Sequence, residues 1–107
     1  MKRLRHFLFA SALLPIAATA AETFLVKDGQ PLAEIVIADK PARAVKIAAN
    51  DLQTYVEKIS GARLPIVTTP AGGPVVEIYL GKSPHTDKLG MADEDLKYGA
   101  FRMISGD

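Results

Sequence analysis

Apolar and polar positions follow two different periods along the chain, and the longest regular pattern lies in its middle. Apolar residues there recur at steps of three and four residues: Val45, Ala48, Ala49, Leu52, Val56 and Ile59. This spacing predicts an amphipathic helix over 41–60, with these residues on its buried face. Asp39 is the expected N-cap, Pro41 fits the first turn, and Gly61 fits the position that ends the helix.

Shorter apolar runs on either side of this helix predict strands. They lie at 23–27, 32–38, 63–69, 75–81 and 100–104. Asp28-Gly29, between the first two runs, is a strong hairpin signal. Proline and glycine at 70–74 predict a loop. Residues 82–99 are polar and irregular, with at most one helical turn near Ala92–Leu96.

This order of elements predicts an α+β fold: a small mixed β-sheet with a βαβ unit over 35–67 and one long helix on one face. The strand at 32–38 carries apolar residues on both faces, which is typical of a strand covered on both sides. No second helix is predicted to cover its other face. Ser105-Gly106-Asp107 is turn chemistry with no element after it. We therefore expect a domain over 22–107 that is truncated at its C-terminus.

The first 21 residues have the three-part pattern of a secretory signal peptide. A basic start is followed by an uncharged apolar run at 7–14 and by Ala18-Thr19-Ala20. The run is short for a membrane span, which needs about 20 residues, and Pro15 interrupts it. We expect cleavage near Ala20 or Ala21 and a secreted or periplasmic protein. Periplasm, cell surface and medium stay open.

Charge and cysteine content narrow the function classes. Three of the 13 basic residues and none of the 12 acidic ones lie within 1–21, so residues 22–107 would carry 10 basic and 12 acidic groups, a net charge of −2. This balance argues against a nucleic-acid partner and gives no reason to expect a membrane partner after signal cleavage. The chain has no cysteine, so no disulfide supports so small a domain.

Two glycine-containing stretches resemble nucleotide-binding loops but lack the required spacing. Residues 80–83, Leu-Gly-Lys-Ser, match the second half of a P-loop, which needs a glycine where this chain has Val76. A helix should follow Ser83, and 84–87, Pro-His-Thr-Asp, do not predict one. Residues 70–74, Pro-Ala-Gly-Gly-Pro, open no helix and are too short for a dinucleotide fingerprint. Neither stretch predicts a cofactor site.

The remaining chemistry-bearing residues form no recognisable constellation. His85, the one histidine after the signal, is expected to be a solvated loop residue, and Asp93–Asp95 lack the spacing of a calcium loop. Four aromatic residues could stack on a sugar: Tyr55, Tyr79, Tyr98 and Phe101; of these, Tyr55 and Tyr79 are expected in the core instead. No pair of carboxylates can be selected for glycosidase chemistry from the sequence. The serines lack a nucleophile-elbow context: Ser60, Ser83 and Ser105. The sequence predicts no catalytic, cofactor-binding or metal-binding residue.

The helix and the strand after it carry a resemblance. Residues 42–67, ARAVKIAANDLQTYVEKISGARLPIV, resemble the N-terminal domains of α-glucuronidases and β-N-acetylhexosaminidases. In the same domains, residues 77–90 resemble the next strand and the loop after it. Residues 98–107 resemble the strand that comes after this loop. The positions that match the helix and strand motif are Ala48-Ala49, Leu52, Tyr55-Val56, Ile59, Ser60-Gly61 and Leu64-Pro65-Ile66.

The resemblance implies a non-catalytic N-terminal domain of a secreted glycoside hydrolase, a class acting on polysaccharides such as xylan. In that family the α+β domain precedes a (β/α)₈ barrel, which carries the catalytic carboxylates. No catalytic residue can be carried over to this chain, because the barrel is absent from it. The implied partner is a downstream barrel of the same polypeptide, and whether the parent protein is an enzyme stays open. The alternative is a freestanding secreted module that binds carbohydrate or protein without catalysis.

Overall fold

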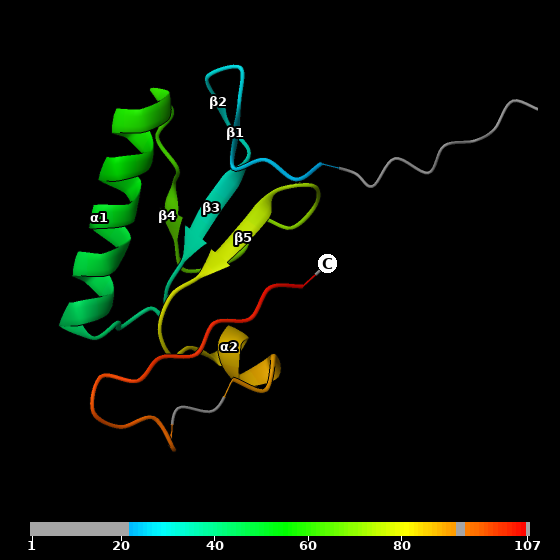
Figure 1. Ribbon diagram of the computed structural model, residues 1–107. Coiled ribbons are helices and arrows are strands. Elements are labelled where there is room, and N and C mark those ends of the chain that lie inside the picture. Colours follow the sequence, from blue (N-terminus) through cyan, green and yellow to red (C-terminus); the bar gives the residue numbers. More distant parts are fainter. Residues whose placement is uncertain (1–21, 92–93, 107) are drawn as a thin grey trace, which may run out of the picture.

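The computed structural model describes residues 22–91 and 94–106, which form a small mixed α/β unit with two sheets and one long helix (Figure 1). The predicted signal peptide, 1–21, lies outside the described residues. The three-stranded sheet has the order β4-β3-β5, and both of its strand pairs are parallel. The elements are β1 (Val26–Lys27), β2 (Gln30–Pro31), β3 (Ala33–Val36), α1 (Arg43–Ser60), β4 (Ile66–Val67), β5 (Val76–Tyr79) and α2 (Pro84–Lys88).

The predicted hairpin forms at Asp28-Gly29. Both residues have positive φ, 52° and 74°, as a two-residue turn of type I′ requires. Lys27 pairs with Gln30 on the two sides of the turn, and β1 and β2 make a separate antiparallel sheet. The predicted mixed sheet is therefore divided, with antiparallel pairing in the hairpin and parallel pairing in the main sheet.

Helix α1 begins later than predicted and ends where predicted. Ala42 is its N-cap, with no side-chain hydrogen bond, so the prediction of Asp39 as N-cap is wrong. The carbonyl of Ala42 accepts the first helical hydrogen bonds, which leaves Pro41 before the helix rather than in its first turn. Gly61 closes the helix in the left-handed conformation, and its N–H donates to the Glu57 carbonyl at 2.8 Å, as predicted.

One face of α1 packs against the main sheet and forms the core. Val45, Ala49, Leu52 and Val56 take part in it, as predicted, together with Ala33, Ile35 and Ile37, Leu64, and the inward residues of β4 and β5. Three predictions of burial on this helix are wrong. Ala48 is exposed, Tyr55 is 61% exposed and Ile59 is 85% exposed. These three positions lie on the flank of the buried stripe, where no strand formed by residues 22–91 and 94–106 covers them.

The second face of β3 is covered, which corrects the expectation of a bare face. Val36 and Glu34 are 1% and 3% exposed. The Ala71 N–H, from the predicted loop at 70–74, donates to Glu34 Oε1 at 2.6 Å. The loop therefore folds back over the sheet on the side away from α1.

The region after β5 differs most from the prediction. Residues 100–104 form no strand and are exposed, so the prediction of a fifth strand is wrong in this structure. The short helix α2 was missed, although Ser83-Pro84 and Thr86 form a capping box with proline in the first turn. The predicted helical turn near Ala92–Leu96 is described only at 94–96: Glu94 and Asp95 lie in a turn, Leu96 has no regular structure, and residues 92–93 lie outside the described residues.

Candidate functional site

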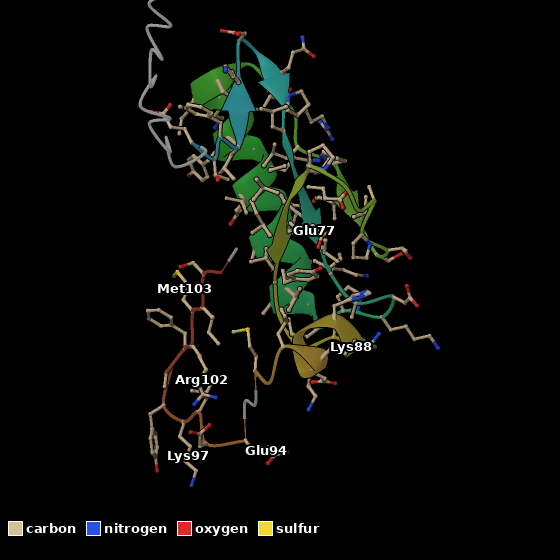
Figure 2. All side chains as sticks on the ribbon, turned by 90° about the vertical axis from the view of Figure 1, so that its right-hand side faces the viewer. Glu77, Lys88, Glu94, Lys97, Arg102 and Met103 are labelled. Carbon is tan, nitrogen blue, oxygen red and sulfur yellow. The ribbon has the colours of Figure 1, made fainter. Side chains whose placement is uncertain are left out.

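A group of polar residues with mutual contacts lies on the second face of the main sheet, opposite α1. Glu34 of β3 is directly opposite Glu77 of β5, and Val36 is opposite Tyr79. Because paired residues of neighbouring strands share a face, the two carboxylates lie side by side. Figure 2 shows Glu77 on β5, with α1 behind the sheet. Together with His85 of α2, these residues form what we call the second-face cluster: Glu34, Glu77, Tyr79 and His85.

Hydrogen bonds and ring contacts connect the cluster. The Tyr79 hydroxyl donates to Glu77 Oε2. The Tyr79 and His85 rings lie with their centroids 5.9 Å apart, tilted by 37°. His85 Nε2 is 3.2 Å from the Thr68 carbonyl oxygen, a geometry that suits an Nε2–H donor. The prediction of His85 as a solvated loop residue is therefore wrong, because it lies half-buried in a helix and contacts two other segments.

The cluster keeps the Tyr79 hydroxyl protonated. The hydrogen bond to Glu77, and then burial, raise the pKa of Tyr79 to about 12, and the negative charges of Glu77 and Glu34 add to the shift. A tyrosine hydroxyl is protonated at neutral pH in any case, and the raised pKa of Tyr79 extends this neutral, donating state to alkaline pH. The phenol is not an anionic base or nucleophile.

The arrangement suits structural cohesion better than hydrolysis. A glycosidase places two carboxylates across a cleft with the sugar between them. Here Glu34 and Glu77 stand next to each other on one sheet surface, and each accepts a hydrogen bond from its own chain. The contacts of the cluster join the 68–71 segment and α2 to the sheet.

The structure also shows the roles of the nucleotide-loop candidates. Val76 lies within β5, so the position where a P-loop needs its first glycine is part of a strand, as predicted. The prediction that no helix follows Ser83 is wrong, because the five-residue helix α2 begins at Pro84. Gly81 has φ +73°, and a Cβ built on it would lie 2.4 Å from Val45 Cγ2. The absence of a side chain at Gly81 therefore allows α1 to pack close to the end of β5. Residues 70–74 form a loop, as predicted.

The remaining sequence candidates are separate from the cluster. Asp95 is exposed and pairs with Arg102 at 3.0 Å, and Asp93 lies outside the described residues. Within 22–91 and 94–106, no group of three or more His, Asp or Glu side chains is placed to hold a metal ion. In the same described part of the chain, neither helix is both long enough and apolar enough for a membrane span.

Sequence reasoning did not select Glu34 and Glu77 as neighbours. The available signal was a single acidic residue inside each of two otherwise apolar strands, at 32–38 and 75–81. Their pairing depends on the parallel register of β3 with β5, which the sequence does not state.

Comparison with known proteins adds no family to this description. The chain matches no protein-family model, no curated protein and no solved structure. The fold and the second-face cluster describe the chain as a small α/β unit with two neighbouring, hydrogen-bonded glutamates on one face of its sheet.

Proposed function

We propose that residues 22–107 are the non-catalytic N-terminal domain of a secreted glycoside hydrolase, α-glucuronidase-like and acting on polysaccharide, in which they support a downstream (β/α)₈ barrel. The observation that carries the proposal is the imbalance between a small core and a large apolar surface. Among the described residues, three large side chains are fully buried: Ile35, Leu64 and Val36. By contrast, these large apolar side chains are exposed: Phe24, Leu25, Leu32, Ile47, Tyr55, Ile59, Leu89, Tyr98, Phe101, Met103 and Ile104.

A neighbouring domain that covered this apolar surface would stabilise the folded protein. Burying one large apolar side chain stabilises by about 1.5–3 kcal/mol. Soluble monomers seldom expose large contiguous apolar patches, and such patches are typical of interaction sites. The absence of cysteine also favours this role, because a small domain without disulfides is stabilised by packing against a larger partner.

The resemblance in the helix points to the same surface. Tyr55 and Ile59 are positions of the helix motif shared with the N-terminal domains of α-glucuronidases, yet here they are 61% and 85% exposed. Neither residue contributes to the core of the described chain. Large apolar side chains at motif positions that face solvent fit a contact with another part of a larger protein.

The test is the coding DNA beyond codon 107. We expect an open frame of several hundred codons with alternating strand and helix patterns and paired carboxylates. The longer protein should cleave aryl glycosides, and its activity should disappear when those carboxylates are replaced by amides. A stop codon directly after codon 107 would overturn the proposal.

The coverage of β3 favours a second candidate, a freestanding secreted module that binds carbohydrate or protein. Glu34 and Val36 are buried without any partner domain. A stop codon after Asp107, together with a folded monomer in size-exclusion chromatography, would support this module. Glycan-array binding would then separate a carbohydrate ligand from a protein ligand.

A further inference from the structure

Strand β5 has one unpaired edge. The N–H groups of Val76 and Leu80 donate to carbonyls of the β3 segment, at 2.9 and 3.0 Å. Because backbone groups alternate in direction along a strand, Glu77 and Tyr79 direct their N–H and C=O groups to the opposite side. Within the described residues β5 pairs with β3 alone. Such an edge is a template for another strand.

An apolar flank of α1 lies on the same side as this edge. Gln53 Nε2, on one flank of the helix, donates to the Leu64 carbonyl at 2.7 Å, just before β4. The opposite flank, which includes Tyr55 and Ile59, therefore faces the side of β5. Residues four apart on a helix share a face, so the two exposed side chains form one apolar stripe.

Residues 100–104 have the composition that this edge and this stripe require. Phe101 and Met103 are 79% and 81% exposed and alternate with Ala100, Arg102 and Ile104. Figures 1 and 2 show the C-terminal segment on the free-edge side of β5, and Figure 1 shows it running in the direction opposite to that strand. In the structure it is undocked, and Arg102 pairs with Asp95.

We propose that the β5 edge is a docking site for residues 100–104 of this same chain, which bind it as an antiparallel strand with Arg102 opposite Glu77. This register places Phe101 opposite Ile78 and Met103 opposite Val76, on the α1 side of the sheet. The two side chains then cover the stripe of Tyr55 and Ile59. On the second face, the guanidinium of Arg102 meets the carboxylate of Glu77. This inference does not depend on the proposed function.

Other registers of residues 100–104 on β5 expose the apolar side chains or leave Glu77 without an opposite charge. A shift of one residue moves Phe101 and Met103 to the polar second face. A shift of two residues places Ile104 or Ala100 opposite Glu77, depending on its direction, and leaves that carboxylate without a cation opposite it. Directly opposed charges of unlike sign stabilise a strand pair by about 0.2–1 kcal/mol. Burial of the Phe101 and Met103 side chains stabilises the pair by more than this, so it determines which face of the docked strand lies towards α1. The charges of Arg102 and Glu77 then determine the register.

The absence of cysteine from the chain allows a direct test by cross-linking. Val76 and Met103 would form a non-hydrogen-bonded pair, whose Cα atoms lie about 4.5 Å apart, within disulfide range. We expect V76C/M103C in the full chain to form an intramolecular disulfide under mild oxidation with diamide. The matched control is V76C/I104C, whose second thiol is on the opposite face. The first pair should react at least about tenfold faster, a preference of about 1.4 kcal/mol.

Charge reversal tests the register. R102E should slow the disulfide of V76C/M103C, and E77R added to R102E should restore it. K97E, a matched change in the same exposed segment, should leave the rate unchanged. Equal rates for the two cysteine pairs, or an intermolecular disulfide in place of the intramolecular one, would overturn the proposal; the second result would assign the edge to another copy. Hydrogen exchange of the cysteine-free chain should show the amides of Glu77 and Tyr79 protected, and unprotected amides would also overturn it.

Discussion

Replacing Gly81 by alanine is expected to destabilise the fold through two separate effects. The new Cβ would lie 2.4 Å from Val45 Cγ2, closer than real Cβ atoms approach other atoms. Overpacking of this kind costs about 1–3 kcal/mol. Gly81 also has φ +73°, where an L side chain costs about 1–2 kcal/mol. The sum is a loss of about 2–5 kcal/mol in the free energy of unfolding.

This loss is large for so small a domain, whose stability is about 0.05–0.15 kcal/mol per residue. The assay is urea unfolding of the full chain followed by far-UV circular dichroism. Gly90 provides the matched control, because it has φ +71° and nothing within 4 Å of a built Cβ. G90A should therefore show the backbone cost alone, about 1–2 kcal/mol.

A double variant separates the steric effect from the backbone effect. V45A removes both methyl groups that the new Cβ would meet, so G81A/V45A should lose less stability than the sum of the two single variants. Equal losses for G81A and G90A would refute the reasoning that Gly81 is required by the approach of Val45. Strict additivity in the double variant would refute it as well.

The remaining predictions concern the core, the cap and the second-face cluster. L64A should lose about 2–5 kcal/mol in urea unfolding, because Leu64 is fully buried, whereas I59A should lose far less. S83A should lose about 1 kcal/mol by removing the cap of α2, and S105A, in an exposed segment, should be neutral. E77Q should lower the pKa of Tyr79 from about 12 towards 10.0, as measured by NMR titration of the Tyr79 ring. Because the folded state binds this proton more tightly, stability should fall as pH rises from 10 to 12, and E77Q should flatten this fall; an unchanged slope would contradict the assignment.

Local signals in the sequence predicted the elements whose formation depends on nearby residues. Asp28-Gly29 predicted the hairpin, because both residues tolerate positive φ. The spacing of Val45, Ala49 and Val56 predicted the helix and its buried face, and Gly61 predicted the end of that helix. Each of these features is decided within a few residues of chain.

Features that depend on tertiary partners were not predictable in the same way. Tyr55 and Ile59 have the apolar character of core residues, but burial needs a neighbouring strand on that side, and in the described part of the chain the sheet ends at β5. Residues 100–104 have the pattern of a strand, but a strand exists only when it is paired. Glu34 and Glu77 became a pair through the parallel register of two strands separated by a whole helix.

The second-face cluster shows why an apolar sheet would keep two carboxylates. A buried carboxylate costs free energy unless it is hydrogen-bonded, so Glu34 favours the loop conformation that brings the Ala71 N–H to it. Glu77 accepts from Tyr79, whose ring contacts His85 and so connects α2 to the same surface. An apolar residue at either position could pack, but it could not select one conformation of the loop or of α2. On the second face, directional hydrogen bonds to the two glutamates therefore fix the positions of the loop and of α2. On the α1 face, apolar packing holds the helix against the sheet.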